Sequence, residues 1–270
     1  MKQIILLIFI LLNQAFAYEF KLSQKDLSFI NNSTKKSFIL NRLEKYQTLK
    51  TQIKDYELIR KLSHVNSFIN RILPAQDIST SSSIDYWATP KEFLLQGHGD
   101  CEDYAISKYF TLLELNIPKE KLYFAVVNIK GEKTAHMILL YLEDKNSTPL
   151  VLDNLSSKVI ELTKRKKLIP KFAFNEIDSY KFTSERFTEK ININWGKENK
   201  WENLLKRVYT LNEWFLIISK SIIAFISAIW EAFFSISKLI SFSISFFSSI
   251  NLALVVPFNK HFFDVIQEFS

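Results

Sequence analysis

Residues 97–112 read GHGDCEDYAISKYFTL. The stretch holds two of the four glycines in the 270-residue chain, and its only cysteine, Cys101. Because the rest of the sequence avoids glycine, Gly97 and Gly99 predict a tight turn whose backbone is closely approached by other atoms. Asp100 then stands where a helix N-cap belongs. Apolar residues follow at helical spacing: Ala105, Ile106, Tyr109, Phe110, Leu112 and Leu113. The pattern places Cys101 in the first turn of a helix with a buried face.

This position favours a reactive thiol at Cys101. Free N–H groups and the helix dipole stabilise a thiolate, which is the form that attacks. A small buried cysteine without chemical function fits the same position, so the residue type alone leaves both interpretations open. A nucleophilic thiolate also needs a base, and the base needs a group that orients it.

Candidates for these two roles lie on β-like runs that follow the helix, at residues 122–129, 135–142 and 149–152. His136 begins the second run, and Asp153 directly follows the third. If these runs pair antiparallel across the polar segment 143–148, the two side chains come close, although the spacing does not fix the register. A half-buried strand histidine and a strand-end aspartate are the ordinary alternatives. The order Cys, His, Asp on a helix and two strands is more specific than any one of the three.

Four segments together resemble the bacterial transglutaminase-like cysteine proteinases, and in particular the periplasmic LapG-type adhesin proteases. They are DYWATP at 85–90, the stretch 97–112, AHMI at 135–138 and PLVLDNL at 149–155. The resemblance covers about residues 60–180 and implies the catalytic residues Cys101, His136 and Asp153. It also implies an α+β fold with a papain/transglutaminase-like core, in which the Cys helix packs on an antiparallel sheet that carries His and Asp.

The implied function is calcium-dependent endoproteolysis of a large surface adhesin near the adhesin's N-terminus, which controls biofilm attachment. The family's calcium-binding acids fall on Asp100 and Glu102. Two negative charges beside the thiol oppose its ionisation, and the helix terminus offsets only about 0.3–1 kcal/mol. Bound Ca²⁺ would neutralise the pair through hard oxygen ligands. The alternative is a pair of ordinary helix-terminal acids, and the sequence does not decide whether Asp103 is a further ligand.

Two other functions remain open on the same scaffold. A catalytic Cys101 would form a thioester with its substrate, the acyl-enzyme. If an amine opened this thioester instead of water, the chain would be an acyl transferase. A catalytically inactive binding module is the other alternative. In related systems an inner-membrane cyclic di-GMP receptor sequesters the protease, so the resemblance also implies such a partner here.

The N-terminus predicts export. Residues 1–17 combine Lys2, an apolar run over 4–12 and the sequence Ala-Phe-Ala at 15–17, which are the parts of a signal peptide. An uncleaved anchor is the alternative, and both place the chain in the periplasm.

A lone cysteine excludes an internal disulfide framework and any multi-cysteine metal site.

Composition and charge limit the kinds of partner that this chain is expected to bind. Hydrophobic residues make up 47% of the chain and charged residues 23%, which excludes disorder over most of its length. The formal charge of +7 comes mostly from scattered lysines, and the densest cluster is Lys164-Arg165-Lys166-Lys167. No nucleic-acid motif accompanies it, so a lysine-rich solvated surface is favoured and no nucleic-acid partner is expected.

Three regions follow the signal peptide: a helical N-terminal region (18–84), the protease core (85–200) and a hydrophobic helical tail (201–270). One apolar stripe at helical spacing, which includes Ile59, runs through the first region from 43 to 72. In the tail, 211–258 is dense in apolar residues, and the 21 residues of 239–259 carry no charge. Serines lower the hydrophobicity of this run, and on a helix the polar residues of the tail would form only a narrow stripe. Inner-membrane attachment is favoured, with helices packed on each other as the alternative.

Overall fold

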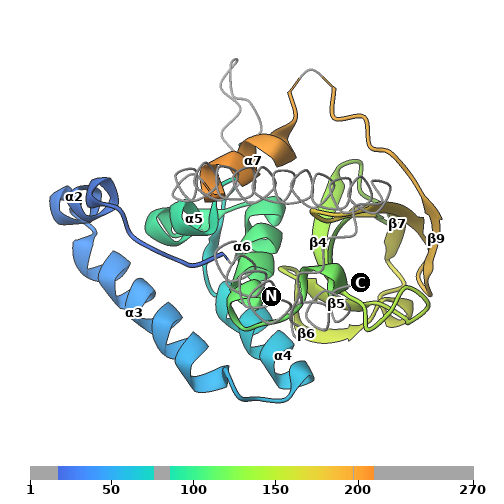
Figure 1. The fold of residues 1–270 in the computed structure, drawn as a ribbon, viewed down its shortest axis with the longest axis horizontal. Helices are drawn as coiled ribbons and strands as arrows, with labels where there is room; N and C mark the ends of the chain where they lie inside the picture. Colours follow the sequence, from blue (N-terminus) through green and yellow to red (C-terminus); the bar gives the residue numbers. More distant parts are fainter. Residues whose placement is uncertain (1–17, 76–85, 197, 210–270) are drawn as a thin grey trace, which may run out of the picture. The chain divides into compact units, whose positions relative to one another are not determined.

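The computed structural model describes residues 18–75, 86–196 and 198–209 (Figure 1). All of them belong to one compact unit, Met1–Glu213. Helices occupy its N-terminal part, and an antiparallel sheet of seven strands follows. The predicted α+β class, with a Cys-bearing helix on an antiparallel sheet, is confirmed. The signal peptide and the tail from residue 210 lie outside the described residues.

Three helices form the N-terminal region: α2 (Gln24–Asn32), α3 (Lys36–Ile53) and α4 (Leu58–Ile69). Most of the predicted apolar stripe is buried: Leu43, Tyr46, Leu49, Ile53, Leu62, Val65, Ile69 and Ile72. The stripe is not continuous, however, because the chain turns between α3 and α4. Ile59 therefore falls outside the buried face of α4 and is 47% exposed, which corrects its place in the stripe.

The predicted turn before Cys101 joins α5 (Pro90–Gln96) to α6 (Cys101–Glu114). Gly97 ends α5 with a φ of +78°, a conformation that favours glycine. The next two residues form β2 (His98–Gly99), which pairs in parallel with β1 (Leu73–Pro74). A Cβ at Gly99 would lie 2.5 Å from Asp103 Oδ2 and 2.8 Å from the Phe93 ring. Both glycines are therefore required where the sequence predicted a close approach.

Replacing Gly99 with alanine is expected to lower the free energy of unfolding by about 1–3 kcal/mol, the usual effect of overpacking. Neither Phe93, which is fully buried, nor Asp103 can withdraw from the added methyl group. Thermal unfolding of the two proteins measures the difference. Gly131→Ala is the control for loop glycines, since a Cβ there has no atom within 4 Å, although its φ of +93° adds strain. Equal melting temperatures for Gly99→Ala and the wild type would contradict the packing at Gly99.

The sheet has the strand order β6-β5-β4-β3-β7-β8-β9, and every neighbouring pair is antiparallel. Its first three strands in the chain are β3 (Leu122–Ile129), β4 (Ala135–Tyr141) and β5 (Leu150–Asp153), close to the three predicted runs. Four more strands follow: β6 (Ser156–Glu161), β7 (Leu168–Phe174), β8 (Ser179–Phe182) and β9 (Phe187–Lys190). Short 3-10 turns, η1 (Lys119–Lys121) and η2 (Leu162–Lys164), precede β3 and follow β6.

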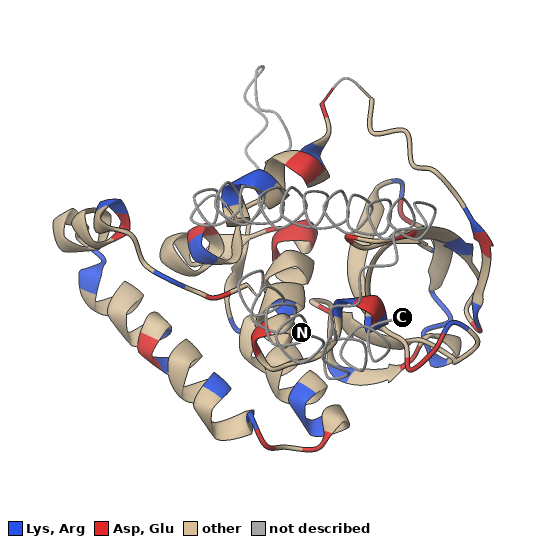
Figure 2. Cartoon of the chain, in the orientation of Figure 1, with Lys and Arg blue, Asp and Glu red and all other residues tan. Residues whose placement is uncertain are grey.

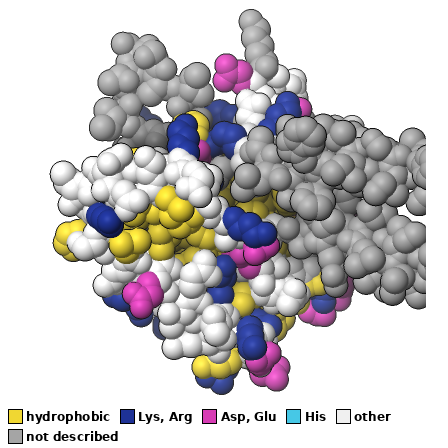
Figure 3. Space-filling view, turned by 60° about the vertical axis from the view of Figure 1, so that its left-hand side comes forward, with side chains coloured by type: hydrophobic (Ala, Val, Ile, Leu, Met, Phe, Trp, Pro, Cys, Tyr) yellow, Lys and Arg dark blue, Asp and Glu magenta, His cyan; other side chains and the backbone are white. Residues whose placement is uncertain are grey.

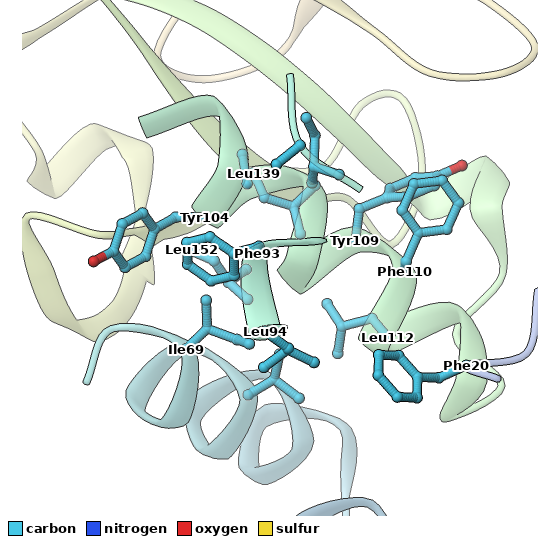
Figure 4. Close-up of a cluster of buried hydrophobic side chains, with 14 of the residues drawn as sticks. Phe20, Ile69, Phe93, Leu94, Tyr104, Tyr109, Phe110, Leu112, Leu139 and Leu152 are labelled. Atoms are coloured by element: carbon cyan, nitrogen blue, oxygen red, sulfur yellow. The ribbon is translucent and has the colours of Figure 1, made fainter. Parts of the chain in front are cut away.

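The core lies on both faces of the sheet. Along β3, Leu122 and Phe124 pack toward the helices, while Tyr123, Ala125 and Val127 belong to a second cluster. Helix α6 contacts β4 and β5 as well as α4 and α5, so it is covered on several sides. Figure 4 shows the buried side chains where these elements meet. The helix that carries Cys101 is thus held rigidly in the middle of the unit.

Helix α7 (Lys200–Tyr209) completes this core. Trp201 and Leu204 are buried, and Arg207 pairs with Glu92 of α5 at 2.6 Å. The predicted boundary between residues 200 and 201 therefore falls inside a helix that packs on the protease core.

A chain of residues 18–209 is expected to keep the stability of the core, whereas one of residues 18–200 is expected to lose several kcal/mol. Burying a large apolar side chain contributes about 1.5–3 kcal/mol, and the shorter chain lacks both Trp201 and Leu204. Denaturant unfolding of the two chains checks this. Identical midpoints would mean that α7 does not belong to the core.

The described surface carries charges of both signs. Figure 2 shows Lys and Arg spread over helices and strands together with Asp and Glu. Figure 3, which brings α2 and α3 forward, shows hydrophobic side chains gathered in patches on that face. The exposed apolar side chains of α2 and α3 include Leu27, Phe29, Phe38 and Leu40. In the part of the chain that the structure describes, no helix has the length and hydropathy to cross a membrane.

Candidate active site

Cys101 is the first residue of α6, directly after the N-cap Asp100. Its thiol is partly buried and accepts a 3.4 Å hydrogen bond from the backbone N–H of Met137 on β4. The neighbour of Met137 is His136, so the helix terminus and the start of β4 meet at the thiol. The structure thus brings the nucleophile candidate to the strand that carries the base candidate.

His136 and Asp153 form a buried pair. Nε2 of His136 lies 2.8 Å from Oδ1 of Asp153, and the side chains are 7% and 0% exposed. The pairing follows from topology, because β4 begins at the same end of the sheet at which its antiparallel neighbour β5 ends. Leu139 lies opposite Leu152, which sets the register that the sequence left open.

The Asp153 carboxylate is held at both oxygens. Oδ1 also accepts the N–H of Leu155 at 2.9 Å, and Oδ2 pairs with Nη2 of Arg165. Burial alone would raise the pKa of Asp153, but the hydrogen bond and charge of His136, the bond from Leu155 and the charge of Arg165 lower it to about 2. Asp153 is therefore ionised and can only accept hydrogen bonds.

This acceptor fixes the tautomer of His136. Because Asp153 cannot donate, Nε2 of His136 carries the shared proton, and Nδ1 is left as the basic nitrogen. Within the described residues, no hydrogen bond joins His136 to the Cys101 thiol, and the contact that orients this candidate base is the one with Asp153.

The thiol instead contacts an acid. Cys101 Sγ donates a 2.8 Å hydrogen bond to Oε2 of Glu102. Burial, the charge of Glu102 and this hydrogen bond raise the pKa of the Cys101 thiol well above its usual range, and Asp100 adds to the rise. The Met137 N–H acts in the opposite direction. The neighbours of the thiol therefore favour its protonated form.

The three acids around Cys101 differ in their surroundings. Asp103 is 3% exposed, and its oxygens accept the backbone N–H groups of Ala88, at 2.7 Å, and Asp100, at 3.3 Å. It therefore ties the segment before α5 to the start of α6. Asp100 and Glu102 are both partly exposed. The described residues contain no group of three or more His, Cys, Asp or Glu side chains that could hold a metal ion.

Three residues near Asp153 have no counterpart in the sequence-based site. Lys108 of α6 is 1% exposed, and burial lowers the pKa of its ammonium to about 7 against the opposing charge of Asp153. Asn70 Nδ2 donates to the Asp153 carbonyl at 2.8 Å. Arg165 is the third. It belongs to the basic cluster 164–167, which has the sequence of a solvated surface. Its contact with Asp153, which only the structure shows, identifies it as part of the site.

A pocket between α3 and α4 is a different feature. It has a volume of about 490 Å³, and its lining includes Asn41, His64 and Arg71 but none of the five candidate site residues. The chemistry described above therefore does not depend on it.

A thiol at a helix N-terminus beside a His–Asp pair on an antiparallel sheet defines the class of transglutaminase-like cysteine enzymes. Residues 40–170 match the family model described as bacterial transglutaminase-like cysteine proteinase. LapG of Legionella pneumophila is 32% identical, with a TM-score of 0.53 over 63% of this chain and 89% of its own. The chain belongs to the bacterial transglutaminase-like cysteine proteinase family.

Two further structures of the Legionella pneumophila protein are similar. Its EGTA-treated form is 32% identical, with a TM-score of 0.54 over 63% of this chain and 89% of its own. Its calcium-bound form is 34% identical, with a TM-score of 0.53 over 62% and 89%. A comparison with curated proteins gives no match.

Proposed function

We propose that this cysteine protease is a calcium-dependent periplasmic endopeptidase that cleaves the N-terminal region of a large surface adhesin and thereby controls biofilm attachment. One observation carries the catalytic part: the buried 2.8 Å contact of His136 with Asp153, on the strand whose Met137 N–H reaches Cys101 Sγ. The similarity to LapG supports the choice of substrate class.

The reaction divides into two steps. Nδ1 of His136 takes the thiol proton as Cys101 Sγ bonds to the scissile carbonyl carbon, and it then passes that proton to the leaving amine nitrogen as the C–N bond breaks. Water, deprotonated by the same nitrogen, opens the thioester and returns the thiol. Asp153 keeps Nε2–H in place and stabilises the imidazolium that forms. The Cys101 N–H, in the first turn of α6, would donate to the oxyanion.

Asp100 and Glu102 have the donor chemistry that calcium requires. Both residues are partly exposed and flank Cys101 in the sequence, and their carboxylate oxygens are the hard ligands that calcium takes. Since Ca²⁺ takes 6–8 oxygen ligands, backbone carbonyls or water would complete its shell. When bound, the ion would supply positive charge that offsets the two acids raising the pKa of the Cys101 thiol. The existence of calcium-bound and EGTA-treated LapG structures supports this part of the proposal.

Location and partners form the rest of the proposal. Removal of residues 1–17 would leave the enzyme in the periplasm, and 211–258 would attach it to the inner membrane near a cyclic di-GMP receptor that sequesters it. The signal-peptide features and the apolar composition of 211–258 support this, and both segments lie outside the described residues. Release of full-length protein by osmotic shock without detergent would contradict the attachment.

One experiment separates this function from its two alternatives. The mature chain is incubated with calcium, an N-terminal fragment of a large surface adhesin and a fluorescent primary amine. An endopeptidase yields two shorter fragments without label. An acyl transferase yields a labelled product, which is a shorter fragment if the acyl group comes from the peptide bond and a full-length fragment if it comes from a glutamine side chain with loss of ammonia. An inactive binding module yields no product. Any labelled product, or unchanged substrate, would therefore overturn the proposal.

A further inference from the structure

Arg165 differs from the lysines beside it. Lys164, Lys166 and Lys167 are exposed, whereas the Arg165 side chain is only 17% exposed and turns inward. The turn η2 directs it there, because Leu162 is buried and accepts the Arg165 backbone N–H at 2.9 Å. The guanidinium thereby reaches Oδ2 of Asp153.

The contact constrains the direction of the carboxylate. A carboxylate is planar, so fixing Oδ2 against Arg165 fixes where Oδ1 points. Oδ1 is the atom that meets His136, at 2.8 Å. The backbone of Asp153 is held separately, by the 2.8 Å bond from Asn70 of α4 to its carbonyl. Arg165 therefore acts on the side chain, and Asn70 acts on the main chain.

Arg165 also supplies the charge that a fully buried carboxylate needs. A neutral His136 gives Asp153 a hydrogen bond but no counter-charge. Lys108 is a weaker source of charge, because burial lowers its pKa to about 7 and it makes no hydrogen bond to Asp153 among the described residues. A guanidinium stays protonated at every working pH. It therefore keeps Asp153 ionised while the imidazole is neutral, which preserves the Nε2–H tautomer.

Hydrogen bonds within the protein do not by themselves explain why the Arg165 guanidinium is turned inward. Nη1 of Arg165 is buried and has no hydrogen-bond partner in the described part of the chain, which is unfavourable for a guanidinium. We propose that Arg165 is a positioning residue for the reaction: it holds Asp153 so that Oδ1 orients His136. This inference rests on the proposed function, because it assumes that the His136–Asp153 pair serves catalysis.

A spectroscopic test does not require substrate. The His136 Nε2–H proton is buried against a carboxylate and is expected to give a downfield proton NMR resonance that disappears in His136→Gln. Arg165→Gln should shift or broaden this resonance, and Arg165→Lys should restore it, because only one nitrogen of the guanidinium contacts Asp153. Lys166→Gln removes the same charge from an exposed neighbour and should leave the resonance unchanged. A wild-type resonance in Arg165→Gln, or none in the wild type, would overturn the inference.

Kinetics test whether Arg165 acts through Asp153. Arg165→Gln is expected to lower kcat about 10- to 100-fold, as do lost partners of metal-ligating histidines, with little change in KM. Arg165→Lys should recover most of the loss. When Asp153→Asn is already present, adding Arg165→Gln should lower kcat by less than about a further twofold, because the carboxylate that Arg165 holds is gone. Losses that multiply, or full activity in Arg165→Gln, would overturn the positioning role.

The same series separates this inference from the proposed function. If Asp153→Asn keeps wild-type kcat, the triad itself is wrong and the inference falls with it. If Asp153→Asn loses activity while Arg165→Gln does not, only the role of Arg165 is wrong. Thermal unfolding of each variant shows whether a loss of kcat comes from loss of folded protein.

Discussion

Replacing His136 with glutamine is expected to lower kcat for adhesin cleavage by about 10²- to 10⁴-fold, the usual contribution of a general base. Glutamine can still donate an amide N–H toward Asp153, but it has no basic nitrogen to take the Cys101 proton. KM should change little, since the substitution removes proton transfer and not a binding surface. Steady-state kinetics with a purified adhesin fragment gives both constants.

His64→Gln is the matched control. The ring of His64 packs on Tyr56 of the N-terminal region at a centroid distance of 5.4 Å, and it contacts none of the site residues described above. That variant should retain wild-type kinetics. If His136→Gln keeps more than a tenth of the wild-type kcat while folded, another group must be the base.

Calcium removal is expected to have the second large effect. EGTA should lower cleavage about tenfold or more, because each unit by which the Cys101 pKa falls on binding calcium raises the thiolate fraction tenfold at fixed pH. Added Ca²⁺ should restore the activity. Mg²⁺ should do so poorly, since the smaller ion demands octahedral geometry and keeps its water.

Variants of the two acids sharpen this prediction. Asp100→Ala and Glu102→Ala should not respond to calcium and should stay well below the activity of the calcium-saturated wild type, whereas Glu132→Ala, an exposed acid in another turn, should respond normally. Cys101 is the only cysteine, so alkylation by iodoacetamide reports on it alone. In EGTA, Glu102→Ala should be alkylated faster than the wild type, because the thiol loses its acceptor and a neighbouring charge. Full activity of either acid variant in EGTA would rule out the calcium role.

Much of the site could be predicted because its signals are local. Glycines in a glycine-poor chain marked the turn at 97–99, and short, mostly apolar β-like runs marked the strands that carry His136 and Asp153. The N-cap Asp100 marked the start of α6. The register was the missing step, since it depends on which residues of β4 and β5 face each other, and that is set by packing across the whole sheet.

Residues that support the site could not be found in this way. Arg165 stands in a basic run whose sequence looks like solvated surface, and only the fold of η2 turns it toward Asp153. Asn70 lies at the end of the amphipathic helix α4, where a polar residue normally faces water. Lys108 lies on a helix that is covered by both the sheet and other helices, so a one-sided pattern underestimates its burial. In each case Asp153 lies on a different element of the fold, 12 residues from Arg165 and 83 from Asn70.

Cys101 is expected to attack the peptide bond of a protein substrate. A direct test compares the wild type with Cys101→Ala, at equal concentration and with saturating calcium, on the same adhesin fragment, with products identified by mass spectrometry. The wild type should give one defined cleavage and Cys101→Ala none, and the variant should keep the wild-type melting temperature. Cleavage at the same bond by folded Cys101→Ala would contradict this role of Cys101.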